Sequence, residues 1–213
     1  MDRRPLLLAA ASAALAGAVY LVIAHVAFAQ RIDLRVLEDT MSHYTYDRAT
    51  LAGDFIAFFD PASFALLLAF LVGGAMLAGR TRAGIAVGAA VLGAEVTAQL
   101  LKPLLAVQRP SPADHYMPAA AWPSGHTTAA VSLLLGLLIV LPPRLRPPVA
   151  VIGGAFAALA LGSLVFLGSH YPSDVLGGIF VSAAWCAVAL AVSGTGRAPT
   201  GARTSRSLRR ATG

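Results

Sequence analysis

Six long apolar stretches constrain the fold of this chain more than any other feature. A helix needs roughly 20 apolar residues to cross a bilayer, and these stretches reach or approach that length. Because lipid offers no partners to backbone polar groups, segments of this kind cross the membrane as helices. The sequence therefore predicts an all-α integral membrane protein with six transmembrane helices in a bundle. The expected spans are residues 5–28, 58–79, 83–101, 125–141, 148–167 and 174–193.

Composition supports this prediction and excludes two other classes of protein. The chain is 57% hydrophobic and only 12% charged, whereas a water-soluble domain carries about 25% charged residues. Its single cysteine, Cys186, excludes a disulfide framework within the chain. The arginines lie at the borders of the apolar stretches and not on a basic face with stacking aromatic residues, so no nucleic-acid partner is expected.

The charged residues predict how the spans are oriented. When the connections are assigned alternately to the two sides, 11 of the 16 Lys and Arg residues fall on the side of the termini. Eight of the 10 Asp and Glu residues fall on the opposite side. Because basic connections prefer the cytoplasm, we expect a multi-pass protein of the plasma (inner) membrane with both termini cytoplasmic.

Three segments at the edges of the predicted bundle carry signals of their own. The first span ends in AHVAFAQ, whose Ala-x-Ala resembles a signal-peptide cleavage site, although its length favours an uncleaved helix. Residues 30–57 are polar, acidic and amphipathic, and they predict a short helix or loop on the outer surface, an interfacial connection rather than a binding element. Residues 194–213 are rich in Gly, Arg and Ser and predict a disordered basic cytoplasmic tail after a membrane domain of residues 1–193.

Three polar clusters interrupt the apolar pattern, and the predicted topology places all three on the extracytoplasmic side. They are KPLLAVQRP at 102–110, PSGH at 123–126 and GSHYPSD at 168–174. His126 and His170 are separated by two membrane crossings, so both emerge on the same face of the membrane. We therefore expect the two imidazoles to share one pocket at the membrane border.

The first two clusters are suited to bind an anion. Lys102 is a compact point charge, and Arg109 can hold a phosphate through two parallel hydrogen bonds. Ser124 is suited to cap the fourth span, and Gly125 lets the free N–H groups of that helix approach an anion closely. Each residue alone also has a plainer interpretation, as a cation at the lipid border or as an ordinary helix cap.

The third cluster can supply a nucleophile. If Asp174 begins the sixth span, its carboxylate can reach a ring nitrogen of His170, fix the tautomer and leave the other nitrogen free to attack. The alternative is a helix-capping Asp beside an unrelated His. Taken together, two cations, a helix N-terminus and two histidines on one face are the parts that phosphoryl transfer needs.

The three clusters resemble the signature blocks of the type 2 phosphatidic acid phosphatases, a family of integral-membrane lipid phosphate phosphatases related to vanadium haloperoxidases. KPLLAVQRP follows the pattern Lys, six residues, Arg-Pro, and PSGH matches its block fully. The resemblance implies that His170 is the nucleophile and forms a phosphohistidine. It further implies that Asp174 orients His170 and that His126 protonates the departing lipid oxygen and then helps to activate water.

The same resemblance assigns the phosphate-binding residues. Lys102, Arg109, Ser124 and the backbone of Gly125 would hold the phosphate oxygens. No metal or other cofactor is expected.

The third block departs from the family pattern at one position. The family has Ser-Arg where this chain has Ser163-Leu164. Loss of one charge-assisted hydrogen bond from a transition state costs about 10- to 150-fold in rate, and loss of an arginine finger roughly 10³–10⁵-fold. We therefore expect an enzyme of low activity. The residues on the correct side to replace the missing cation are Arg31, Arg35, Arg48 and His115.

Two further acids have open interpretations. Glu95 lies about two helical turns before Lys102, where it either steadies the floor of the pocket or pairs with a polar neighbour. Asp60 lies at the start of the second span and is interpreted as an interfacial helix cap.

The sequence thus predicts a metal-independent membrane hydrolase that removes phosphate from a lipid at the outer leaflet. The candidate substrates are a polyprenyl phosphate or pyrophosphate, phosphatidic acid and phosphatidylglycerol phosphate. The alternative is a catalytically weakened protein that binds or transports lipid phosphates. The two histidines and Asp174 favour the enzyme, because binding alone needs neither a nucleophile nor an acid.

Overall fold

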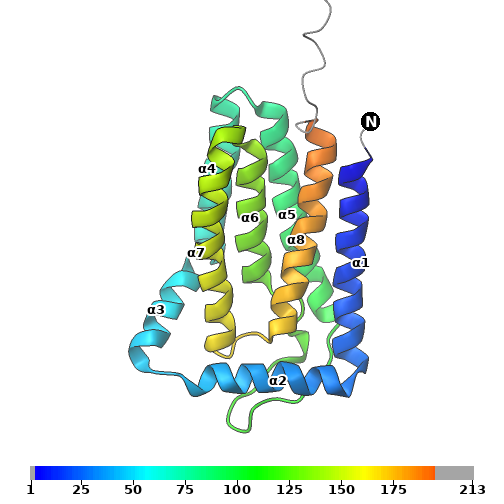
Figure 1. Cartoon of the computed structure of the whole chain (residues 1–213), viewed down its shortest axis with the longest axis vertical. Helices are drawn as coiled ribbons and strands as arrows, with labels where there is room; N and C mark the ends of the chain where they lie inside the picture. The colour runs from blue at the N-terminus through cyan, green and yellow to red at the C-terminus, as the bar shows by residue number, and fades with distance from the viewer. Residues whose placement is uncertain (1–2, 195–213) are drawn as a thin grey trace, which may run out of the picture.

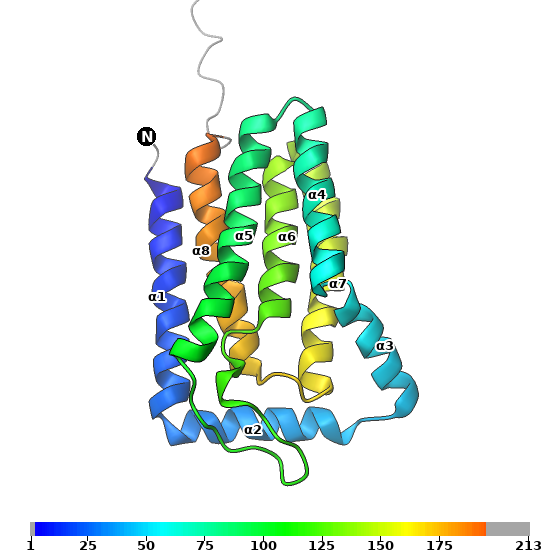
Figure 2. The same ribbon diagram turned by 180° about the vertical axis from the view of Figure 1, so that it is seen from behind.

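The computed structural model describes residues 3–194, and every regular element in this part of the chain is helical. Six long helices run side by side as a bundle (Figures 1 and 2). They are α1 (Arg4–His25), α4 (Pro61–Leu77), α5 (Thr81–Leu104), α6 (Gly125–Val140), α7 (Arg146–Phe166) and α8 (Pro172–Ser193). Short 3-10 turns, η1 (Ala119–Ala121) and η2 (Pro143–Leu145), precede α6 and α7.

Five of the described helical segments are long and apolar enough to cross a membrane. A sixth span results when α3 (Tyr46–Ala57) and α4 are counted together, and this pair is bent by 45° at the break between its two helices. The prediction of an all-α membrane bundle is confirmed, with helix ends displaced by a few residues. The bend follows from the sequence, because Pro61 starts a new helix and cannot continue the preceding one.

Close packing at the centre of the bundle brings α6 against α5 and α8. A Cβ atom at Gly136 of α6 would lie only 2.6 Å from the Val87 side chain of α5. A Cβ atom at Gly178 of α8 would lie 2.8 Å from the carbonyl oxygen of Ser124, at the start of α6. Since protein interiors are close-packed, only glycine permits these approaches. The second contact places the second polar cluster against the third.

The two ends of the bundle differ in chemistry. α1 begins and α8 ends at the same end (Figure 1). There, Arg82 donates to the Val192 carbonyl at 2.8 Å and Arg80 donates to the Val140 carbonyl, so cations cover the last carbonyl groups of α8 and α6. The three polar clusters gather at the opposite end.

Helix α2 (Ala27–Ser42) crosses that opposite end of the bundle (Figures 1 and 2). Its Leu37 is fully buried and packs in a cluster with Met117 and Tyr171, whereas Phe28 and Ile32 remain exposed. The segment predicted as a short helix or loop is therefore two helices, α2 and α3. Of the tail predicted at 194–213, only Gly194 belongs to the described residues.

Candidate active site

The third polar cluster forms a buried pair of His170 and Asp174 at the start of α8. The His170 Nδ1 atom lies 3.3 Å from Asp174 Oδ2, as the i, i+4 spacing predicts. The same oxygen accepts the backbone N–H of Tyr171 at 3.0 Å, and the Asp174 side chain is fully buried. Against an ionised Asp174, Nδ1 carries the proton, so the lone pair is on Nε2. The pair is therefore arranged for nucleophilic attack by Nε2.

Arg109 is bound by acids on two different elements. Its Nη2 donates to Asp174 Oδ1 at 2.6 Å, and its Nη1 donates to Asp33 Oδ2 at 3.3 Å and to Ser173 Oγ at 3.0 Å. The guanidinium carbon also lies 4.0 Å from the centre of the Tyr171 ring. The sequence assigned Arg109 to the phosphate, whereas here these acceptors take three of its five N–H donors.

Two groups beside Arg109 have displaced pKa values, and both displacements come mainly from burial. Loss of hydration raises the pKa of the Asp33 carboxyl, while hydrogen bonds from Ser173 and the charge of Arg109 oppose that rise. Burial likewise raises the pKa of the Tyr171 phenol to about 12. The neutral phenol donates a hydrogen bond of 2.6 Å to the carbonyl oxygen of Pro110, which fixes the loop that carries Arg109.

The second polar cluster opens a separate cavity of about 200 Å³. Ser124 caps α6, because its side-chain oxygen accepts the Thr127 N–H at 3.3 Å, as predicted. A Cβ atom at Gly125 would lie 2.7 Å from Gln99 Nε2 and 3.7 Å from Lys102 Nζ, so the missing side chain leaves the cavity open beside this cation. The lining residues are Phe59, Pro61, Phe64, Glu95, Gln99, Lys102, Gly125, His126 and Ala129.

His126 has an acidic partner that the sequence did not reveal. Its Nε2 lies 3.1 Å from Oδ1 of Asp60, and both side chains are partly exposed. Asp60 makes no side-chain cap to α4, so its interpretation as a helix cap is corrected: the carboxylate orients an imidazole instead. The two residues are 66 positions apart in sequence.

A backbone hydrogen bond joins the two parts of the site. The Ser124 N–H donates to the Asp174 carbonyl at 3.0 Å, beside the close approach of Gly178. All three polar clusters therefore meet at one end of the bundle. Of the two histidines, His126 lines the 200 Å³ cavity and His170 is not among its lining residues.

A comparison with known protein families decides which family has this arrangement. The model of the PAP2 superfamily matches residues 83–197, a range that contains all three clusters. The chain belongs to the PAP2 superfamily.

Two similar proteins extend this assignment. The fold matches the crystal structure of the first transmembrane PAP2 type phosphatidylglycerolphosphate phosphatase from Bacillus subtilis, with a TM-score of 0.68 and 21% sequence identity, over 91% of this chain and 96% of that chain. A decaprenylphosphoryl-5-phosphoribose phosphatase of Mycobacterium tuberculosis, in each of two strains, is 34% identical over 142 residues, which cover 60% of this chain and 71% of the relative. The protein is thus a membrane protein of the PAP2 superfamily, similar to phosphatases that act on lipid phosphates.

Leu164, at the position where the sequence resemblance implies an arginine, is buried in α7, with 2% of its surface exposed. Its carbonyl oxygen accepts the backbone N–H groups of Ser169 at 2.9 Å and His170 at 3.3 Å. Two residues considered as substitutes for the missing cation have other contacts. His115 Nε2 lies 2.8 Å from the Gly168 carbonyl, and Arg48 donates to the His43 carbonyl at 3.4 Å.

Glu95 fits both interpretations left open for it in this PAP2 protein. Its Oε1 accepts a hydrogen bond of 2.6 Å from Gln99, and the residue lines the cavity beside Lys102. Its Oε2 is buried and has no hydrogen-bond partner among the described residues. Glu95 thus pairs with a polar neighbour and also forms part of the pocket wall.

Asp33 is the site residue that sequence reasoning missed most completely, because residues 30–57 were interpreted as a plain connection. A signal was present in the sequence. Asp33 lies four residues before Leu37, so it shares the apolar face of an amphipathic helix. An acid on that face is costly to bury without a partner, and here Arg109 and Ser173 are its partners.

Proposed function

We propose that this protein hydrolyses a phosphate monoester or pyrophosphate of a polyprenyl-type lipid in two steps, through a phosphohistidine. In the first step, Nε2 of His170 attacks phosphorus, the bond from phosphorus to the leaving oxygen breaks, and His126 gives that oxygen a proton. In the second step, water attacks phosphorus, the bond from phosphorus to Nε2 of His170 breaks, His126 takes the water proton, and inorganic phosphate leaves with the lone pair restored on Nε2. The buried pair of His170 and Asp174 carries this proposal, since it prepares one ring nitrogen for attack.

The phosphate oxygens need positive charge as the transition state forms. Lys102 and the backbone N–H of Gly125, in the first turn of α6, supply it from the wall of the 200 Å³ cavity. We assign Arg109 to the same task through the N–H donors that do not bind Asp33, Ser173 or Asp174. Ser124, assigned to the phosphate by the resemblance, is fully buried and its N–H is bound to the Asp174 carbonyl, so we assign it the role of capping α6. Asp60 holds the ring of His126 through Nε2.

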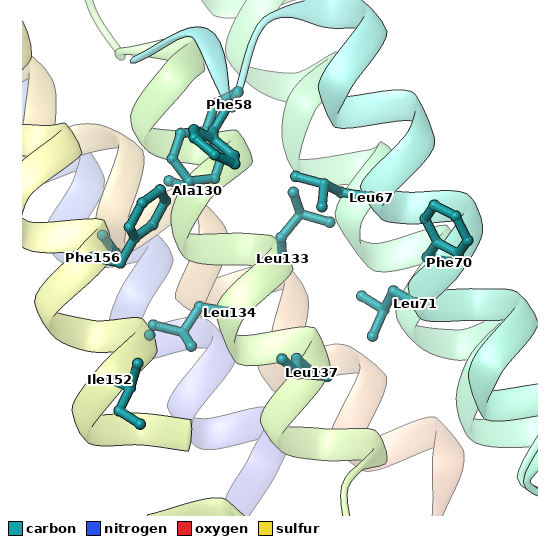
Figure 3. Close-up of a pocket in the computed structure, with 13 residues that line it drawn as sticks. Phe58, Leu67, Phe70, Leu71, Ala130, Leu133, Leu134, Leu137, Ile152 and Phe156 are labelled. Atoms are coloured by element: carbon teal, nitrogen blue, oxygen red, sulfur yellow. The ribbon is translucent and has the colours of Figure 1, made fainter. Parts of the chain in front are cut away.

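A large apolar cavity beside the site supports a lipid substrate. It measures about 570 Å³ and is lined by side chains from α4, α6 and α7, among them Leu67, Leu133 and Phe156 (Figure 3). Phe59 lines this cavity and also the smaller polar one. We propose that the lipid tail packs in the apolar cavity, between α4 and α7, while the phosphate lies beside Lys102.

The similar protein of Mycobacterium tuberculosis is a phosphatase of a decaprenylphosphoryl sugar phosphate. We therefore rank a polyprenyl-linked phosphosugar first among the substrates. A polyprenyl phosphate or pyrophosphate, phosphatidic acid and phosphatidylglycerol phosphate follow.

Purified protein in proteoliposomes tests the proposal through phosphate release from each of these lipids. We expect the polyprenyl lipids to react fastest, His170→Ala to be inactive and Asp174→Ala nearly so. Rapid acid-free quenching with radiolabelled substrate should trap an acid-labile phosphoprotein in the wild type and none in His170→Ala. Equal phosphate release by the wild type and His170→Ala would contradict the proposal that this protein is a phosphatase.

We further propose that the reaction needs no metal ion, as the family resemblance implies. Activity should then be unchanged after dialysis against EDTA. A loss that Mg²⁺ or Mn²⁺ restores would contradict this part of the proposal.

The alternative function is a weakened protein that binds or carries lipid phosphates, and Leu164 favours it. Tight binding of a lipid phosphate without phosphate release, in the wild type and in His170→Ala alike, would support the alternative.

A further inference from the structure

Helix α2 brings a carboxylate into the site from outside the three polar clusters. Asp33 has 7% of its surface exposed. Its Oδ1 accepts the backbone N–H of Ser173 at 3.0 Å, and its Oδ2 accepts the Ser173 hydroxyl and Nη1 of Arg109. Residue 33 also lies outside residues 83–197, the range of the PAP2 family match.

These contacts differ from those of a residue that only fastens α2 to the bundle. The packing anchor of α2 is Leu37, which is fully buried. Asp33 instead contacts Arg109 and Ser173, which flank the pair of His170 and Asp174. A buried carboxylate costs free energy unless its donors compensate, and here all its donors belong to the site.

The charges around Arg109 alternate along one line of contacts. One guanidinium lies between two carboxylates, with 3.3 Å to Asp33 and 2.6 Å to Asp174. Asp174 in turn faces Nδ1 of His170. With both acids ionised, the cluster beside the imidazole carries one net negative charge.

We propose that Asp33 is a positioning residue for the phosphatase reaction, acting on His170 through Arg109 and Asp174. It holds Nη1 so that Nη2 meets Asp174, and it takes up part of the charge of Arg109. Asp174 thereby keeps its hold on the imidazole instead of being neutralised by the guanidinium. The inference rests on the proposed function, and it makes the helix that crosses the end of the bundle part of the active site.

Asp33→Asn removes the negative charge. It replaces Oδ2, the oxygen that accepts from Arg109, by an amide NH₂ group. Oδ1 can still accept the Ser173 N–H, so the helix contact is largely kept. The positive charge of Arg109 then falls on Asp174 alone, and the imidazole faces no net negative charge. Turnover (kcat) should fall about 10-fold, with a smaller change in KM.

The pH profile separates a positioning role from a structural one. The groups that face this line of contacts are Asp33 from α2, Arg109 from its loop, and His170, Tyr171 and Asp174 from the start of α8. Less negative charge beside the imidazole weakens its hold on a proton, so the acidic limb of the kcat/KM profile should move to lower pH in Asp33→Asn. Asp33→Glu keeps the charge and should return the limb toward its wild-type position.

Two control variants sharpen the experiment. Asp39→Asn removes a charge from the exposed side of the same helix and should leave turnover and the pH profile unchanged. Leu37→Ala loosens the packing of α2 against Met117 and Tyr171 but removes no hydrogen-bond partner of Asp33 or Arg109, so it should lower thermal stability and leave the acidic limb in place. All variants are compared as the full chain in proteoliposomes, with polyprenyl phosphate as the probe.

The outcomes distinguish this inference from the proposed function. If His170→Ala is inactive while folded Asp33→Asn has wild-type turnover and pH profile, Asp33 has no positioning role. The same conclusion follows if Leu37→Ala moves the acidic limb as far as Asp33→Asn does. If Asp33→Asn does not fold, Ser173→Ala serves instead, because it removes one donor to Asp33 and one acceptor of Arg109 Nη1. It should shift the limb in the same direction, and an unshifted limb overturns the inference. Equal activity of the wild type and His170→Ala overturns the phosphatase proposal itself.

Discussion

At the scale of single residues, a few charged groups of the site each make several contacts. Arg109 contacts two carboxylates and a hydroxyl, and Asp174 holds Arg109, His170 and a backbone N–H. A change at any of these residues therefore affects several bonds together, and we expect double variants within the cluster to be far from additive.

Leu164 offers a direct test of the charge that the family pattern includes and this chain lacks. Leu164→Arg places a guanidinium on the residue whose carbonyl oxygen accepts the backbone N–H of His170. We expect turnover of polyprenyl phosphate to rise at least about 10-fold, the value of one charge-assisted hydrogen bond. Phosphate release under saturating substrate measures this change.

Leu164→Met is the matched control, because it changes shape without adding charge and should leave turnover within about two-fold of wild type. A folded Leu164→Arg protein with unchanged turnover would mean that another group already serves this role.

Gly125 gives a second prediction at this scale. In Gly125→Ala the new methyl group meets Gln99 Nε2 at 2.7 Å and Glu95 Oε1 at 3.2 Å, so it narrows the 200 Å³ cavity proposed to hold the phosphate. We expect kcat/KM to fall about 10-fold, which steady-state kinetics measures.

Gly154→Ala on α7 is its control, since a Cβ atom there meets nothing within 4 Å. Equal kinetics for the two variants would show that the phosphate does not use this cavity.

At the scale of helices, α6 and α8 position the site because glycine lets them approach closely. The starts of both helices could be predicted from the sequence, whereas their close approach could not. Pro172 and Asp174 mark the start of α8, and Ser124 marks the start of α6, because the caps are local in sequence. Asp33 and Asp60 could not be found in the same way, since their partners are 140 and 66 residues away. Each looked like an ordinary acid at a membrane border until the helices were assembled.

Gly178→Ala and Gly136→Ala test this packing as a pair. Both add a methyl group against a neighbour, at 2.8 and 2.6 Å respectively, and we expect each to reduce stability by about 1–3 kcal/mol. Only Gly178 faces Ser124, so only Gly178→Ala should also lower kcat by more than the loss of folded protein explains. Thermal unfolding and phosphate release on the same samples separate the two effects. Equal specific activity of the two folded variants would contradict this role of Gly178.

At the scale of the whole molecule, all three polar clusters lie at the end of the bundle opposite the start of α1 and the end of α8 (Figure 2). From the distribution of charge, we expect both termini in the cytoplasm and the site on the outer side. A tag at the C-terminus of the protein in intact cells should then resist an impermeant labelling reagent, whereas a cysteine placed at Asp39→Cys should react. The reverse pattern would place the site in the cytoplasm.

The wall that Phe59 forms between the polar and the apolar cavity has a practical consequence for any measurement. An alkyl chain of a solubilising detergent is chemically equivalent to a lipid tail, so we expect it to enter the same apolar space, with its head group close to Lys102. Long-chain surfactants should therefore act as competitive inhibitors, and short-chain ones less so. Kinetic constants determined in micelles will understate the affinity that the protein has for its substrate in a bilayer nanodisc.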